Sequence, residues 1–255
     1  MEEALGRSLA TGNTAEIFEW GSRVMKLYKS PAAKRAAFHE AATSAAVEAL
    51  GLPVPKVWEV HEVGGRWGVV FDRVTQKSFA DQMLGNRDNI SRHLECMVRL
   101  HIRIHSHQAI QFAGLKFRLA ANIGASPLLD KPHKQELLDA IVDMPDGDRL
   151  CHGDFHPLNI LGDTAGPTII DWPDARRGDP AADVCRSYLL LKLHFAEIAT
   201  AYLDAYCHFS NMSCDTVMRW LPYVAAAKLA EGVLGERDGL LEIIASSPTV
   251  ASPST

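Results

Sequence analysis

The chain has 255 residues, of which 47% are apolar, and it carries a formal charge of −5 at neutral pH. This length allows one large domain or two smaller parts that share a site, with enough apolar residues for a sizeable core. A negative charge argues against a nucleic-acid protein, which needs a basic surface. We find no apolar run near the roughly 18 residues of a membrane span, and the acidic start is not a signal peptide. We therefore expect a cytoplasmic protein that binds neither nucleic acid nor membrane.

The five cysteines do not suggest disulfides or a metal site. They form no Cys-x-x-Cys pair, and their number is odd. Such a pattern is typical of reduced, mostly buried cysteines in a cytosolic protein.

The first part of the chain is rich in strands. Apolar and alternating runs predict strands at residues 17–20, 24–28, 56–60 and 67–71. Between the second and third of these runs, the alanine-rich segment 32–50 predicts a helix. We expect Ser30 to be its N-cap, Pro31 to lie in its first turn and Gly51 to end it. Counting one further strand ahead of residue 17, we expect five strands and one helix here.

From about residue 78 the pattern becomes helical. Apolar residues recur at helical spacing between Asn89 and His107. Further helices are predicted at 116–122, 133–142, 183–208, 214–229 and 236–244. Strands followed by helices predict an α+β protein, because a doubly wound sheet would alternate the two throughout. The glycine patterns of P-loop and dinucleotide-binding proteins are missing from the sequence.

Three polar residues in the middle of the chain suit Mg²⁺-dependent phosphoryl transfer. Asp154, Asn159 and Asp171 stand between short apolar segments. The segments 160–161 and 168–170 predict two strands joined by a hairpin turn that contains two glycines and a proline. One carboxylate can accept a proton from an attacking hydroxyl, while a carboxylate and an amide oxygen can hold the metal ions that screen a triphosphate.

These residues follow a longer ordered pattern. His-Gly-Asp at 152–154 is followed after four residues by Asn159 and then by Asp171. From Asp171 the chain continues as Asp-Trp-x-x-Ala-x-x-Gly-Asp-Pro-x-x-Asp, ending at Asp183. The two halves together resemble the aminoglycoside phosphotransferase/choline kinase group, whose members share the protein-kinase-like fold.

The resemblance implies an α+β, protein-kinase-like two-lobed fold with a small antiparallel-sheet N-lobe and a mainly helical C-lobe. The lobes are expected at residues 1–74 and 75–247, followed by a flexible tail at 248–255. The implied activity is ATP- or GTP-dependent transfer of the γ-phosphoryl group to a hydroxyl of a small molecule, with Mg²⁺ as cofactor.

The same resemblance assigns roles to the central residues. Asp154 is the expected catalytic base, and Asn159 and Asp171 are the expected metal ligands. Asp179 and Asp183 are expected to brace the loop that presents Asp171, and Asp179 also suits a helix N-cap before a proline.

Further positions are implied for the nucleotide. Lys26, on the third strand, is expected to hold the phosphates, and Glu40, in the middle of the helix, is expected to steer Lys26. Thr14, in the turn of residues 9–15, is expected to reach a phosphate oxygen. The backbone of Asp72 and Val74 is expected to contact the base.

Three other interpretations stay open on the residues alone. The carboxylates can be solvated loop residues, as isolated aspartates usually are. The protein can be a kinase-like pseudoenzyme that binds nucleotide without turnover. It can also be a binuclear metallohydrolase, whose candidate ligands are His152, Asp154, His156 and Asp171.

The histidines before the catalytic stretch do not by themselves indicate a metal. His101, His105 and His107 lie on a predicted apolar helix, where core or surface histidines are commoner than ligands. The sequence does not identify the acceptor beyond a small hydroxylated substrate, with aminoglycoside-like and other antibiotics among the candidates. It leaves the choice of ATP or GTP and the oligomeric state open.

Overall fold

A computed structural model describes residues 5–31 and 33–246. The chain forms two compact units. Unit 1 comprises Met1–Ile90 and Pro157–Asp174, and unit 2 comprises Ser91–His156 and Ala175–Thr255, within the described residues. Packing thus groups the hairpin expected around residues 160–170 with the N-terminal sheet. The lobes expected at 1–74 and 75–247 remain a prediction, and the tail expected at 248–255 lies outside the described residues.

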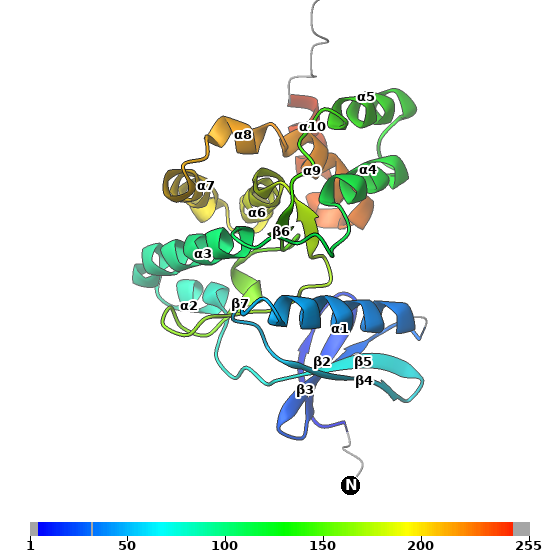
Figure 1. The fold of residues 1–255 in the computed structure, drawn as a ribbon, viewed down its shortest axis with the longest axis vertical. Helices are drawn as coiled ribbons and strands as arrows, with labels where there is room; N and C mark the ends of the chain where they lie inside the picture. The colour runs from blue at the N-terminus through cyan, green and yellow to red at the C-terminus, as the bar shows by residue number, and fades with distance from the viewer. Residues whose placement is uncertain (1–4, 32, 247–255) are drawn as a thin grey trace, which may run out of the picture. The chain divides into compact units, whose positions relative to one another are not determined.

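Unit 1 is built on a five-stranded antiparallel sheet in the order β1-β2-β3-β5-β4. The strands are β1 (Ser8–Thr11), β2 (Ala15–Trp20), β3 (Arg23–Tyr28), β4 (Val57–Val63) and β5 (Arg66–Phe71). Helix α1 (Lys34–Glu48) packs against β4 and β5, across the sheet, as Figure 1 shows. The predicted five strands and one helix are therefore present.

The two faces of the sheet carry separate apolar clusters. Met25 and Leu27 on β3 are buried on one face with Trp20 and Val70. Lys26 and Tyr28 alternate with them and so point to the opposite face. On that face Tyr28 packs in a cluster that includes Ala37 of α1. A cation on β3 is thereby directed toward the helix side of the sheet.

The neighbouring strand approaches Lys26 closely. Gly68 on β5 lies opposite Leu27. A Cβ atom at Gly68 would lie 2.9 Å from the backbone oxygen of Lys26. Only glycine therefore lets β5 pair with β3 at this register.

The start of α1 differs from the expectation. The N-cap residue is Ala33, which makes no side-chain cap hydrogen bond, so the assignment of Ser30 as N-cap is wrong. Ser30 instead accepts a hydrogen bond through its backbone oxygen from Ala33 N–H, at 3.1 Å. The chain makes a turn before the helix begins, and this turn displaces the cap by three residues. Gly51 follows the helix with a positive φ of 73°, as expected of a glycine after a helix end.

The predicted catalytic hairpin belongs to unit 1. Strands β7 (Ile160–Leu161) and β8 (Thr168–Ile169) pair antiparallel. In the connecting turn, the side chain of Asp163 accepts hydrogen bonds from two backbone N–H groups. Helix α2 (Phe79–Gly85), which sequence reasoning did not predict, begins with a capping box formed by Ser78 and Asp81. The side chain of Gln82 donates to the Gly162 carbonyl at 2.6 Å and attaches α2 to the hairpin.

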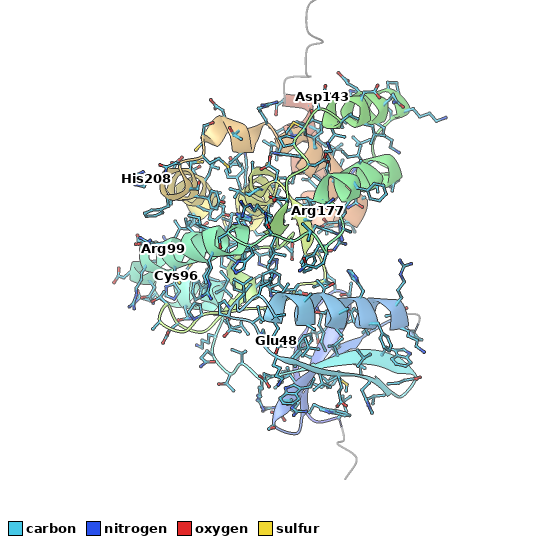
Figure 2. The ribbon with its side chains drawn as sticks, viewed as in Figure 1. Glu48, Cys96, Arg99, Asp143, Arg177 and His208 are labelled. Atoms are coloured by element: carbon cyan, nitrogen blue, oxygen red, sulfur yellow. The ribbon has the colours of Figure 1, made fainter. Side chains whose placement is uncertain are left out.

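Unit 2 is mainly helical. Its helices are α3 (Ile90–His105), α4 (Leu115–Ala125), α5 (Lys131–Ile141), α6 (Pro180–His194), α7 (Ala196–Ser210), α8 (Cys214–Met218), α9 (Leu221–Lys228) and α10 (Arg237–Ser246). Strands β6 (Arg149–Cys151) and β9 (Arg176–Gly178) form a short antiparallel ladder. Arg177, labelled in Figure 2, lies on β9 and donates its backbone N–H to the Ala113 carbonyl.

Two long helices of the prediction are each split in the structure. The helix expected at 183–208 is two helices, which meet at Phe195 with φ −143° and ψ 51°. The helix expected at 214–229 is α8 and α9, because the chain turns at Trp220 and Pro222 occupies the first turn of α9. Asp179 caps α6 as predicted, accepting from Ala181 N–H at 3.0 Å.

Among residues 5–31 and 33–246, no helix is both long and apolar enough to span a bilayer. The five cysteines all lie in the described part of the chain, and all are free thiols.

Candidate active site

Lys26 lies at the centre of a charged cluster in unit 1. Its Nζ donates to Glu40 Oε1 and to Asp171 Oδ1, each at 2.7 Å. The crossing of β3 and α1 brings Lys26 and Glu40 together, and the chain after β8 brings Asp171 to the same amine. The structure thus joins three of the residues selected from the sequence.

The ion pairs with Glu40 and Asp171 keep Lys26 protonated. Burial alone would lower the pKa of Lys26, but the carboxylates of Glu40 and Asp171 outweigh it and raise the pKa above its ordinary value. Lys26 is therefore a cation at any pH the protein meets. Glu40 is 1% exposed, and burial raises its pKa against the opposing effect of Lys26.

Tyr28 completes this cluster, and sequence reasoning missed it. Its hydroxyl donates to Glu40 Oε2 at 2.5 Å, on the side of the carboxylate away from Lys26. Burial first and Glu40 second raise the pKa of Tyr28, so its hydroxyl keeps its proton. A sequence signal existed: Tyr28 follows Lys26 by two residues on a strand and must face the same side.

Asn159 and Asp171 flank the short hairpin of unit 1. Asn159 immediately precedes β7, and Asp171 follows β8 by two residues. Ile170 N–H donates to the Asn159 carbonyl at 3.0 Å, so the two backbones run side by side. Asp171 has a positive φ of 67°, in the left-handed region that aspartate and asparagine tolerate better than other non-glycine residues. An amide and a carboxylate oxygen, both hard ligands, suit Mg²⁺ at this edge.

The other predicted nucleotide residues are not part of this cluster. Thr14 is exposed in the turn between β1 and β2, where its carbonyl accepts from Lys29 N–H. Asp72 follows β5 and its side chain accepts from the Trp58 indole at 2.7 Å. Val74, two residues further on, is partly buried. The roles expected for these three residues in nucleotide binding stay predictions.

Asp154 belongs to unit 2, on the loop after β6. Its Oδ2 lies 3.2 Å from His156 Nε2, and its Oδ1 accepts from the Arg186 guanidinium at 3.4 Å. Burial alone would raise the pKa of Asp154, but His156 and then Arg186 outweigh it and hold the pKa well below its ordinary value. Asp154 is therefore ionised throughout the physiological range.

The loop that carries Asp154 is held by Asp183, and this corrects an expectation. The carboxylate of Asp183 accepts from His152 N–H at 2.6 Å and from Gly153 N–H at 2.8 Å. Asp183 thus braces the loop before Asp154, and the prediction that it braces the loop presenting Asp171 is wrong. Asp179 instead caps α6 and accepts from the Trp220 indole.

Arg186 connects Asp154 to a further series of charges that the sequence did not indicate. Its guanidinium also contacts Glu231 at 2.8 Å, and Lys228 bridges Glu231 and Glu236 at 3.0 and 2.7 Å. Burial would raise the pKa of Glu231, but Arg186 and Lys228 lower it below its ordinary value. A third of the Glu231 side chain is exposed, so an ionised carboxylate faces solvent. Arg186 connects this carboxylate to Asp154 through two ion pairs. The only sequence signal was Arg186 at one helical turn from Asp183.

The sheet of unit 1 and the helices of unit 2 define the α+β, protein-kinase-like fold predicted from the sequence. Comparison with solved structures confirms this fold. A thermostable variant of aminoglycoside phosphotransferase APH(4)-Ia, solved with ADP and hygromycin B, matches with a TM-score of 0.68 and 16% identity, over 95% of this chain and 90% of that one. An aminoglycoside-3'-phosphotransferase of type VIII matches with a TM-score of 0.61 and 20% identity, over 90% and 92%.

A third similar structure is the aminoglycoside phosphotransferase APH(3'')-Id from Streptomyces rimosus, solved with ADP and streptomycin. It has a TM-score of 0.61 and 17% identity, over 84% of this chain and 90% of that one. At such identities the likeness establishes the fold alone. A search of curated protein sequences gave no match.

The family follows from the sequence match. The model of the phosphotransferase enzyme family matches residues 12–223, which include both halves of the catalytic pattern. The chain belongs to the phosphotransferase enzyme family. The predicted resemblance and the predicted enzyme class, a small-molecule phosphotransferase with an alcohol group as acceptor, are thereby confirmed.

Proposed function

We propose that this protein transfers the γ-phosphoryl group of ATP or GTP to a hydroxyl group of a small molecule, with Mg²⁺ as cofactor. One observation carries the proposal: Lys26 is bound at once to the buried Glu40 and to the partly exposed Asp171. The three charges sum to −1, so the cluster gains from a divalent cation. Glu40 anchors the amine, and Asp171 can exchange the amine for a metal ion that arrives with nucleotide phosphates.

The proposed roles follow from the chemistry of each group. Asn159 and Asp171 would hold Mg²⁺, which would screen the charge of the phosphates, and Lys26 would neutralise phosphate oxygens. The acceptor oxygen attacks the γ-phosphorus, the bond from that phosphorus to the leaving diphosphate breaks, and the hydroxyl proton passes to Asp154. The low pKa of Asp154 makes it a weak base, which suits a loose transition state in which orientation of the hydroxyl matters most.

Two further assignments complete the proposal. Thr14 contacts a phosphate oxygen, and the backbone of Asp72 and Val74 contacts the base. The complexes of similar folds with ADP and with aminoglycosides support a nucleotide and a polyhydroxylated amine as the substrates. The ionised, partly exposed Glu231 would favour an acceptor that carries an ammonium group.

The decisive experiment has two steps. Calorimetry should first show Mg²⁺-dependent binding of ATP or GTP, at the micromolar to millimolar strength usual for enzyme substrates. Nucleotide consumption should then be measured against aminoglycosides, other hydroxylated amines, sugars, macrolides and amino alcohols. Binding without turnover of any acceptor would favour a pseudoenzyme, and no Mg²⁺-dependent binding would refute the proposal.

Metal analysis separates the kinase from the metallohydrolase. A kinase purified without added metals should contain none and should bind Mg²⁺ only with nucleotide. About two equivalents of tightly held Zn²⁺ or Mn²⁺, with phosphatase activity that His156→Ala abolishes, would instead support the hydrolase, because imidazole nitrogens prefer such metals.

A further inference from the structure

The most extensive buried polar cluster around the catalytic loop involves the two histidines of α3 that the sequence left unassigned. His101 and His105 lie one helical turn apart, at 0% and 6% exposure. Their Nε2 atoms lie 3.0 and 3.2 Å from the same oxygen, Oδ2 of Asp183. Their rings are adjacent, with centroids 4.1 Å apart. Both histidines therefore converge on the carboxylate that holds the catalytic loop.

A matching pair of tyrosines lies on α7. Tyr202 and Tyr206 are also one helical turn apart, and both are buried. The hydroxyl of Tyr202 lies 2.6 Å from His101 Nδ1, and the hydroxyl of Tyr206 lies 2.6 Å from His105 Nδ1. Each histidine is thus bonded at both ring nitrogens.

The proton positions in this cluster follow by elimination. Burial would raise the pKa of Asp183, but hydrogen bonds from His101 and His105 hold it far below its ordinary value, so Asp183 only accepts. Each Nε2 that faces Asp183 must therefore carry a proton. Burial lowers the pKa of His101 to about 3, so His101 is neutral, its Nδ1 accepts and Tyr202 donates. We assign the same proton positions to His105, which has the same kinds of partner.

Asp183 links the two histidines to the backbone of the loop. The carboxylate accepts four N–H groups: His152 and Gly153 from the backbone, and His101 and His105 from side chains. Three of these donors reach Oδ2, and Gly153 alone reaches Oδ1. Rotation of the carboxylate would break several buried hydrogen bonds at once, so its two oxygens stay aimed at the loop.

We propose that the two Tyr–His pairs are positioning groups for phosphoryl transfer. Each tyrosine hydroxyl donates to Nδ1 of its histidine and fixes the ring in the orientation that points Nε2–H at Asp183. Asp183 in turn holds the loop of residues 152–154 and hence Asp154. Loss of one hydroxyl leaves a buried Nδ1 without its donor, so the ring loses one of the two contacts that fix its orientation toward Asp183. This inference rests on the proposed function.

The test compares Tyr202→Phe, Tyr206→Phe and the double variant with Tyr223→Phe. Tyr223 is a buried tyrosine of α9 that takes no part in the cluster. Each single variant should lower kcat about 10-fold, and the double variant should approach the roughly 10²-fold loss that a small misplacement of a catalytic group causes. The KM for nucleotide should stay within about 2-fold of wild type. Tyr223→Phe should keep wild-type kcat, and unchanged kcat in the double variant would overturn the proposal.

A pair of variants at His105 separates positioning from packing. His105→Gln keeps a side-chain N–H for Asp183 and should retain most of kcat, whereas His105→Leu should not. An equal loss of kcat in both variants, with equal melting temperatures, would show that His105 acts through the shape of its ring and not through its N–H. That result would overturn the proposal.

A direct readout does not depend on turnover. Nitrogen-15 NMR of histidine-labelled protein should show His101 and His105 protonated at Nε2 alone, and Tyr206→Phe should shift the His105 Nδ1 signal, which loses its hydrogen-bond donor, while Nε2 keeps its proton. Protonation at Nδ1 in the wild type would overturn the proposal even if no acceptor were turned over. The three converging ligand atoms also suit a metal ion, so a tightly bound transition metal whose removal changes these signals would overturn it as well.

Discussion

Acidification should destabilise the protein through His101. Burial first and neighbouring His105 second lower the pKa of His101 from 6.5 to about 3. A histidine whose folded pKa lies below its unfolded value binds a proton more readily in the unfolded chain. Stability should therefore be complete above about pH 6.5 and should fall as the pH drops from there toward 3.

The size of the effect follows from the two pKa values. One pKa unit corresponds to about 1.4 kcal/mol, and between pH 7 and pH 5 His101 should cost about 2 kcal/mol of unfolding free energy. In a protein of this size that corresponds to a melting temperature lower by about 4–8 °C. The titratable groups that face His101 are His105 on α3, His152 on the loop after β6, Asp183 on α6, and Tyr202 and Tyr206 on α7.

Urea unfolding and thermal melting at pH 7 and pH 5 measure the effect, and two variants isolate it. His101→Gln removes the titrating group, so its stability should change about 2 kcal/mol less than that of wild type over this range. His208→Gln removes an exposed histidine of α7 (Figure 2) and should follow the wild type. Equal pH dependence in wild type and His101→Gln would refute the reasoning.

Three further predictions concern the proposed reaction. Asp154→Asn should lower kcat by roughly 10²–10⁴ with little change in nucleotide affinity, since it removes the proton acceptor alone; steady-state kinetics and calorimetry measure the two quantities. Asp171→Asn should instead weaken Mg²⁺-dependent nucleotide binding in calorimetry, and wild-type affinity would contradict its role as a metal ligand. Tyr28→Phe should cost about 1–3 kcal/mol of stability, because Glu40 loses a buried hydrogen bond, and should raise the KM for nucleotide; an unchanged melting temperature would contradict this.

The sequence predicted the fold class and most elements because their signals are local. The strand at 24–28 alternates, and the hairpin of β7 and β8 has turn residues between two apolar pairs. The break at Phe195 was missed, since no proline or glycine marks it and both flanking segments favour helix. The start of α1 was misplaced because Ser30 and Pro31 form a turn that resembles a cap in sequence alone.

The candidate site was predicted where residues are close in sequence or follow a known pattern. Asp154, Asn159 and Asp171 fall within 18 positions and were found together. The histidine partners of Asp183 were not predicted, because His101 and His105 precede Asp183 by 82 and 78 residues. The histidines were expected to be core or surface residues, and they are buried. Their contacts with Asp183 could be seen only in the packed structure.

The backbone conformation of Asp171 restricts which amino acids position 171 tolerates. With φ at 67°, it lies in a region that costs most side chains about 1–3 kcal/mol and that aspartate and asparagine tolerate best. A glutamate would keep the charge but would suit this backbone less well and place its carboxylate one methylene further from the backbone. Asparagine would tolerate the same backbone conformation but would lose the charge. Glycine would tolerate the conformation but would lose both the charge and the side-chain oxygen. Chemistry and chain geometry thus select the same residue, so a change of metal or nucleotide preference would more easily arise from Asn159 or from the residues around Lys26 than from Asp171 itself.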